Sequence, residues 1–258
     1  MSNESEIVSE LLLIKEAMSV FTHETLGKIS ASCSELLDGD LPDEARTALA
    51  DIDKECLTLL RNRILLESLV DYRGGEYARK DGVKNCCFLP DVYANCIKTA
   101  GTICAQSGAS FDYSDFAPPC KLTVSARKCS LLMLLPLSLA FSHDPGAAIR
   151  LDAARRGNKA ELVYRISGSL PDIDGLVNEC RKTDRSSGIF FEEPLLAYSL
   201  SQTASACGAE LLIGENSMTL CLPVAETEAE VDSAPEPYID NRFSLPYIML
   251  SGIVRREI

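Results

Sequence analysis

Two long segments without an internal proline, joined by a short break, constrain the fold of this chain more than any other feature. The first covers residues 4–37, and its apolar side chains recur mainly at steps of three and four, which is the spacing of one helix face. This predicts a single long helix. The positions of its predicted apolar stripe are Ile7, Leu11, Ile14, Met18, Phe21, Thr25, Ile29 and Leu36.

A second helix is expected from about Glu44 to Leu69, after the break DGDLPD at residues 38–43, and it ends before the two glycines of YRGGEY. Two long helices joined by a short turn form an antiparallel hairpin, whose interior is too small to bury both stripes. Pairing with a second copy gives a four-helix bundle, so the pattern predicts a homodimer through residues 4–70. The stripe of the second helix consists of Leu49, Ile52, Cys56, Leu59 or Leu60, and Ile64.

From about residue 84 the pattern changes to strands mixed with helices. Apolar and polar residues alternate on both sides of a Gly-Asn turn in 147–167, which predicts a β-hairpin, and a second hairpin is expected in 209–224. Elements in this order predict an α+β two-layer sandwich. The remaining elements expected are an extended piece, a helix and a strand in 86–114, a strand and a strongly apolar helix in 121–143, and a helix at about 194–207.

The C-terminal part has a different composition. Residues 226–241 are acidic and contain proline, which is typical of a linker, and residues 243–258 resume an apolar pattern that could dock on the body or on a partner. The sequence therefore predicts three parts: a helical hairpin at 1–75, an α+β domain at 84–225, and a linker with an apolar tail at 226–258.

Composition excludes several classes of function. The formal net charge of −13 argues against a nucleic-acid partner, because phosphate backbones attract Lys and Arg. The N-terminus does not resemble a secretory signal, and the apolar run at 130–141 is too short to cross a membrane, so a cytoplasmic protein is expected. The eleven cysteines are then expected to be reduced, and without a C-x-x-C motif and with two histidines they predict no metal site.

Three polar residues elsewhere favour structural roles. Asp172 and Asp174 in LPDIDG lack the rest of a calcium-binding loop and are interpreted as turn residues. His143 in SHDPG is expected at the end of a helix, because proline and glycine follow it.

His23 is the remaining histidine. It lies two residues from both Phe21 and Thr25, or about 200° around the helix from the predicted stripe, so its ring is expected in solvent. An exposed imidazole beside a carboxylate, here Glu24, suits a phosphoryl acceptor. The alternative is an ordinary surface histidine, and the residues alone leave both open.

The string H-E-T-L-G-K at residues 23–28 resembles the H-D-T-L-G-Q phosphoacceptor motif of sensor histidine kinases with a dimeric helical hairpin. The order of elements over roughly 220 residues is also similar to that family: two long helices and then an α+β domain. The resemblance implies that His23 accepts phosphate. It also makes phosphatase activity doubtful, because Lys28 replaces the glutamine whose amide orients water in the family.

Residues 84–224 are similar to the ATP-binding domain of these kinases, which has the GHKL fold. The closest correspondence is at the end, where C-G-A-E-L (207–211) resembles H-G-G-E-L and C-L-P (221–223) resembles the terminal L-P of the family. The resemblance implies an α+β sandwich of GHKL type.

The residues that hold the nucleotide in that family are replaced. Leu139 stands for the Asn of S-N-A that holds magnesium, and leucine has no oxygen ligand. Ile166 and Gly168 are in the place of D-N-G, whose Asp recognises adenine. Pro194 and Leu196 are in the phosphate loop G-L-G-L-A, where glycines let backbone N–H groups approach phosphates. The resemblance therefore implies a GHKL fold without ATP or any other cofactor, although an unrelated α+β domain remains an alternative.

If His23 carries phosphate, another protein must supply it. The first hypothesis is a dimeric histidine phosphotransferase that passes phosphate between the receiver domains of response regulators through His23, with Glu24 and Lys28 as supporting residues. The second is a pseudo-histidine kinase that binds and regulates a response regulator or a kinase without chemistry of its own. The third, a histidine kinase core with residual autokinase activity, is opposed by the substitutions at the nucleotide positions.

Overall fold

The computed structural model describes residues 22–73, 86–182, 192–225, 231–232 and 243–253. The chain forms two compact units, whose boundary in the sequence lies between residues 78 and 79. We describe each unit by itself.

The first unit contains the predicted pair of helices, the first over residues 22–37 and the second, α2, over Asp43–Arg73. Two acidic residues in the first turn of α2 favour a helix start there. The Arg46 guanidinium donates to the carbonyl oxygens of Leu37 (3.0 Å) and Gly39 (3.2 Å), which fixes the turn between the helices. The predicted helix is confirmed over 22–37, and its expected beginning at residues 4–21 lies outside the described residues.

The two helices meet through polar as well as apolar groups. Ser30 on the first helix is fully buried, and its hydroxyl donates to the carboxylate of the buried Asp53 on α2. Cys33, one turn further along the first helix, is also buried. The buried side of α2 consists of Asp53, Cys56, Leu57, Leu60, Arg61, Ile64, Leu65 and Ser68.

The predicted stripe of the first helix is wrong in its register. Thr25, Ile29 and Leu36 are exposed. On α2 the predicted stripe is buried at Cys56, Leu60 and Ile64, and Ile52 is exposed. The inner face of the first helix runs instead through Ser30 and Cys33. Neither is a large apolar residue, so the predicted stripe did not include them. The exposed apolar residues form a second face at steps of seven within each helix: Ile29 (41% exposed), Leu36 (52%), Ile52 (46%), Leu59 (51%) and Leu66 (41%).

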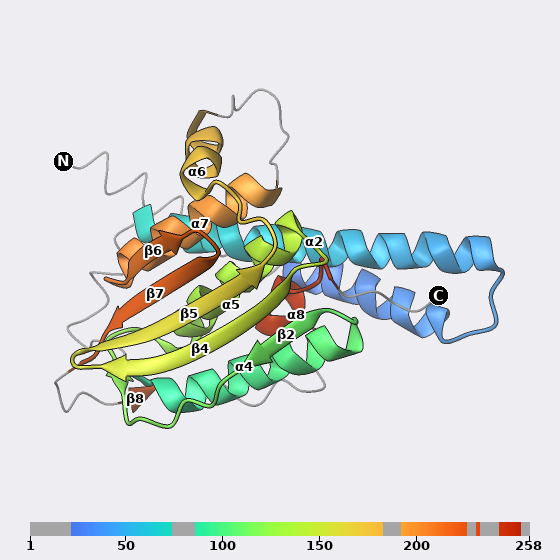
Figure 1. Cartoon of the computed structure of the whole chain (residues 1–258). Coiled ribbons are helices and arrows are strands. Elements are labelled where there is room, and N and C mark those ends of the chain that lie inside the picture. The colour runs from blue at the N-terminus through green and yellow to red at the C-terminus, as the bar shows by residue number, and fades with distance from the viewer. Residues whose placement is uncertain (1–21, 74–85, 183–191, 226–230, 233–242, 254–258) are drawn as a thin grey trace, which may run out of the picture. The chain divides into compact units, whose positions relative to one another are not determined.

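The second unit is built on a five-stranded mixed sheet in the order β2-β4-β5-β7-β6 (Figure 1). Only β2 and β4 are parallel; the other neighbours are antiparallel. Both predicted hairpins, β4–β5 and β6–β7, are confirmed. The strands are β2 Ser110–Tyr113, β4 Ala148–Arg156, β5 Lys159–Ser167, β6 Glu210–Gly214 and β7 Ser217–Pro223.

Helices cover one face of this sheet. In Figure 1, α5 (Ala126–His143) lies behind the strands, with α4 (Leu89–Gln106) and α7 (Glu192–Ala206) on either side of it. Alternate residues of β5, such as Leu162 and Tyr164, are buried. The Tyr164 hydroxyl donates to the Met133 carbonyl of α5 (2.8 Å). The mixed order of helices and strands predicted from the sequence is therefore confirmed.

The opposite face of the sheet is polar. Arg150 lies near both Asp112 (3.7 Å) and Asp152 (3.2 Å), and Arg165 also pairs with Asp152. These side chains alternate with the buried residues of their strands, so they are on the face away from the helices.

Two elements differ from the sequence interpretation. Ile173–Lys182 forms a helix, α6, which was not expected; Asp172 accepts a hydrogen bond from the Gly175 N–H (3.0 Å) and caps it. Asp174 is in the first turn of α6. Both residues therefore start a helix instead of forming a simple turn. Within the predicted linker, Val231–Asp232 forms a short strand, β8, parallel to β1 (Cys86–Phe88), which also pairs with β3 (Lys121–Leu122).

The C-terminal segment packs on the second unit. It contains a short helix, α8 (Leu245–Met249), which contacts α4 and α5. The Ser138 hydroxyl of α5 donates to the Met249 carbonyl (2.6 Å) in a buried position. Ile248, Met249, Leu250 and Ile253 are at most 8% exposed. Because α8 packs on it as well, α5 is buried on all sides from Cys129 to Phe141.

Candidate functional site

His23 lies on the first helix, close to the start of its described part, and its side chain is exposed. The expectation of exposure is met, although the geometric reason for it was wrong. His23 precedes the buried Ser30 by seven residues and is therefore only about 20° from it around the helix axis. The ring is thus in line with the inner face of the hairpin, and not opposite to it.

Glu24 and Lys28 are both exposed and one helical turn apart. The Lys28 Nζ lies 4.0 Å from the Glu24 Oε2, with 81% and 64% of these side chains exposed. A pair this open to solvent contributes little to stability. The structure therefore places all three predicted site residues on a solvent-facing stretch of one helix.

The position of the expected magnesium ligand is part of the core. Leu139 on α5 is fully buried, and its neighbour Ser138 donates to the Met249 carbonyl. An isobutyl group in this place offers no oxygen to a metal ion, and the adjacent hydroxyl is already bonded.

The position of the expected adenine acceptor lies at the end of β5. Ile166 is 3% exposed, and its backbone N–H donates to the Asn216 carbonyl (3.0 Å). Gly168 follows with φ +146°, and a Cβ there would be 2.7 Å from the Asp144 Oδ2. This positive φ favours glycine, and neither the Ile166 side chain nor Gly168 offers a side-chain acceptor for an adenine amino group.

The position of the expected phosphate loop is helical. Pro194 is in the first turn of α7, where its missing N–H removes no helical hydrogen bond. Leu196 is fully buried. A phosphate cradle requires backbone N–H groups that point into open space, and here helical side chains fill the core instead.

Two side-chain contacts join the end of α5 to the start of α7. The Ser142 hydroxyl donates to the Glu192 carboxylate (2.7 Å), and the His143 Nδ1 lies 3.0 Å from the Glu193 Oε2. His143 is the last residue of α5, as predicted. With Asp144, this edge carries three carboxylates, which oppose the approach of an anionic polyphosphate. Sequence reasoning found His143 but not its partner, because residues 50 apart in the chain form this contact.

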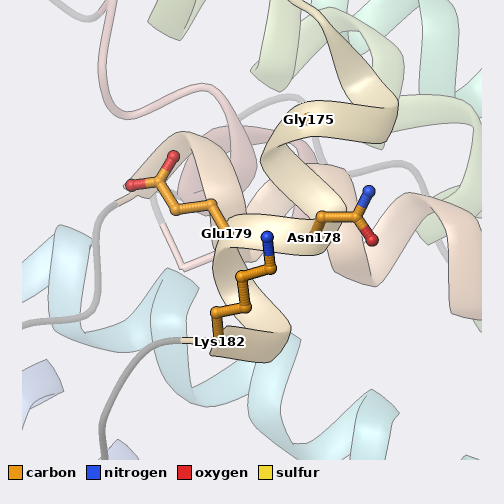
Figure 2. Close-up of a pocket in the computed structure, with 4 residues that line it drawn as sticks. All are labelled: Gly175, Asn178, Glu179 and Lys182. Atoms are coloured by element: carbon orange, nitrogen blue, oxygen red, sulfur yellow. The ribbon is translucent and has the colours of Figure 1, made fainter.

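A shallow groove of about 530 Å3 runs along α6 and is lined by Gly175, Asn178, Glu179 and Lys182 (Figure 2). These residues recur at steps of three, one and three, so they form one side of the helix. None of them is at a nucleotide position inferred from the resemblance. The signal for α6 was available in the sequence: the capping Asp172 precedes apolar residues at helical spacing.

The cysteines are free thiols, and most are buried. Burial raises the pKa of Cys96 and of Cys104 to about 12 and that of Cys207 to about 11, so these thiols are protonated at neutral pH. Within the ranges described, no group of three or more His, Cys, Asp or Glu side chains is arranged to hold a metal ion. None of the helices described is long and apolar enough to cross a membrane.

No protein-family model matches the sequence, and no curated protein matches it. Three solved structures illustrate what the fold is similar to. Full-length ShkA in complex with AMPPNP gives a TM-score of 0.50 at 14% identity, over 83% of this chain and 47% of the ShkA chain. The histidine kinase AdeS of Acinetobacter baumannii gives 0.48 at 12% identity, over 79% of this chain and 98% of AdeS. The histidine kinase ThkA in complex with the response regulator protein TrrA gives a TM-score of 0.48 at 12% identity, over 88% of this chain and 66% of the ThkA chain.

The chain spans about half the length of ShkA. At this level of identity the similarity concerns the fold. AdeS and ThkA are histidine kinases, and this chain has the order of elements that the resemblance to that family implied, a helical pair and then an α+β unit. By fold, the chain is a sensor histidine kinase-like protein with a GHKL-type α+β unit.

Proposed function

We propose that this chain is a histidine phosphotransferase of a two-component phosphorelay. His23 accepts a phosphoryl group from the aspartate of one receiver domain and returns it to the aspartate of another. One combination of features supports the proposal: the imidazole of His23 is exposed on a helix, and buried apolar side chains stand at the positions that the sequence resemblance assigns to nucleotide binding.

The chemistry requires only an accessible neutral imidazole. Its nitrogen lone pair forms the N–P bond as the P–O bond of the aspartyl phosphate breaks, and the carboxylate leaves with its electron pair. Glu24 follows His23 directly, and in this proposal its carboxylate supports the ring. Lys28 lies 4.0 Å from Glu24 and offsets negative charge near the transferring group.

The exposed apolar face of the hairpin supports a homodimer. Five large side chains at steps of seven remain 41–52% exposed on the two helices. Steps of seven are the repeat of helices that pack side by side in bundles. We propose that this face pairs with a second copy to form a four-helix bundle.

Two other functions use the same fold. A histidine kinase core with residual autokinase activity is compatible with it, because the ShkA structure holds AMPPNP. Our proposal differs in expecting no ATP and no other cofactor, because the side chains of Leu139, Ile166 and Leu196 fill the core. A pseudo-histidine kinase that regulates a response regulator by binding alone is favoured by the same buried positions and needs no phosphate on His23.

The three functions separate in one experiment. The protein is incubated with a phosphorylated receiver domain and, separately, with labelled ATP, and acid-labile phosphate on the chain is measured. We expect label from the receiver and none from ATP. His23→Gln is expected to abolish labelling by the receiver. His143→Gln, which removes the only other histidine, is expected to leave this labelling unchanged. Label from ATP would favour the kinase core, and no label from either source would favour the pseudokinase.

The dimer is tested by changing the exposed apolar face. Leu36→Lys with Leu59→Lys is expected to raise the dimer dissociation constant about 100-fold, because two half-exposed leucines per chain lose their burial. Light scattering across a dilution series measures this. The double variant Glu35→Gln with Asp51→Asn adds the same charge outside the face and is expected to dimerise normally. A wild-type protein that is monomeric at micromolar concentration would remove this part of the proposal.

A further inference from the structure

The second unit has a cavity of about 260 Å3 that the nucleotide positions do not line. It lies between α4 and the segment that follows β2. Its walls include three aromatic side chains and two residues of opposite charge, besides two alanines. These five residues are Tyr93, Tyr113, Phe116, Lys98 and Asp115.

The aromatic side chains are held in place by specific contacts. The Tyr93 hydroxyl donates to the Ser114 carbonyl (2.7 Å), and its ring centroid is 5.8 Å from that of Phe116. The Tyr113 ring lies against α4 where Gly101 has no side chain: a Cβ on Gly101 would be 2.7 Å from the Tyr113 Cε1. Burial raises the pKa of Tyr93 far above its ordinary value, so its phenol stays neutral. The aromatic walls are therefore formed before any ligand binds.

The two charged residues come from different elements of the second unit. Lys98 is on α4, Asp115 is on the segment after β2, and both are exposed. Neither forms an ion pair with another residue of the described ranges. An ammonium and a carboxylate thus remain available to a ligand in the lining of one small cavity.

Aromatic rings beside a carboxylate favour an organic cation, because the ring faces and the carboxylate both attract positive charge. A lysine on α4 favours a carboxylate at the other end of the ligand. We propose that this cavity binds a small zwitterion, with its substituted ammonium group near Asp115 and the half-buried Tyr113 ring and its carboxylate on Lys98. The volume is below the range of drug-sized ligands, which fits a molecule of this size.

The test uses glycine betaine as the probe, titrated into the full chain by calorimetry, with saturation-transfer NMR on its methyl protons. We expect saturable binding in the millimolar range or tighter. Choline keeps the cation and lacks the carboxylate, whereas 3,3-dimethylbutanoate keeps the carboxylate and replaces the ammonium by a neutral group of the same shape. Both are expected to bind at least about fivefold more weakly than betaine.

Variants connect the binding to this cavity. Asp115→Asn is expected to weaken betaine and choline by about tenfold, and Lys98→Gln is expected to weaken betaine but not choline. Gly101→Ala is expected to weaken both, because it displaces the Tyr113 ring. Lys182→Gln removes a lysine that lines the groove on α6 and is the matched control, with wild-type binding.

Three outcomes would overturn the proposal. The first is no saturable binding of betaine to a folded wild-type protein. The second is unchanged betaine binding in Asp115→Asn, which is a surface change that leaves the fold intact. The third is 3,3-dimethylbutanoate binding as tightly as betaine, which would show that the cavity does not recognise positive charge.

Discussion

The helical hairpin and the second unit differ in the exposure of their large apolar side chains. On the hairpin, Leu36 and Leu59 are about half exposed, at 52% and 51%. In the second unit, Leu139 and Leu196, which the sequence resemblance assigns to nucleotide positions, are fully buried. Exposed apolar residues at regular spacing are typical of a surface that meets a partner, whereas buried ones belong to a core. The same residue type therefore favours interaction in one region and core packing in the other.

The largest expected effect comes from removing the C-terminal segment. Truncation before Phe243 deletes four buried side chains, Ile248, Met249, Leu250 and Ile253, each of which contributes about 1.5–3 kcal/mol by burial. The total of about 6–12 kcal/mol is comparable to the stability of a whole domain, so we expect the second unit to unfold while the hairpin stays helical. Urea denaturation followed by circular dichroism measures this, with Ser138→Ala as a mild control. A truncated protein that keeps a cooperative transition of normal midpoint would contradict it.

Leu139→Asn introduces the residue type that the sequence resemblance to histidine kinases implies at this position. We expect it to lower the free energy of unfolding of the second unit by about 3–5 kcal/mol, because a buried amide loses its water and finds no open cavity. Calorimetry is expected to detect no ATP binding by this variant. Leu139→Met is the control and is expected to cost less than about 1.5 kcal/mol. Micromolar ATP binding by Leu139→Asn would show that the site is still present under a single changed residue.

High pH is expected to weaken the second unit. The pKa of Cys96 and of Cys104 is about 12 in the folded protein, and burial is the main cause. Above about pH 9 the unfolded chain loses these thiol protons and the folded chain keeps them, so stability falls as pH rises. The two thiols together lower the free energy of unfolding by about 3 kcal/mol at pH 10 relative to pH 7. Denaturation at both pH values measures this, and Cys104→Ala is expected to remove about half of the difference.

The smallest effect is expected at the surface of the hairpin. Lys28→Ala breaks an exposed pair at 4.0 Å, so its free energy of unfolding is expected to change by less than about 0.5 kcal/mol. If Lys28 offsets charge during transfer, phosphate transfer to His23 slows by about two- to fivefold. Rapid-quench measurement with a phosphorylated receiver checks the rate. An unchanged rate would limit the chemistry to His23 and its nearer neighbours.

Local patterns in the sequence were sufficient for most of the elements. The hairpin around Gly157, the apolar helix α5 and the helix pair follow from spacing and turn residues that act over short distances. Which faces of the helical hairpin are buried does not follow in this way. Each of its two helices has an exposed apolar face and an inner face. The inner faces include the small or polar Ser30, Cys33 and Asp53, whose burial depends on the partner helix.

Contacts between distant parts of the chain were also outside the reach of sequence reasoning. The bond between Ser138 and the Met249 carbonyl joins residues 111 positions apart. The contact of His143 with Glu193 spans 50 positions. The cavity near Tyr113 depends on one glycine of α4, Gly101, whose role is visible only when the ring is placed beside it. Such features depend on tertiary structure, which short-range patterns do not specify.

The position of α8 has a consequence for the synthesis of the protein. The helix at the centre of the second unit, α5, is complete in sequence at His143, but the segment that covers it ends near Ile253. A ribosome synthesises the chain from the N-terminus onward, so the apolar α5 is made well before the segment with α8 that covers it. The second unit therefore cannot close its core until residues 245–253 have been made, about 100 residues after α5 is complete.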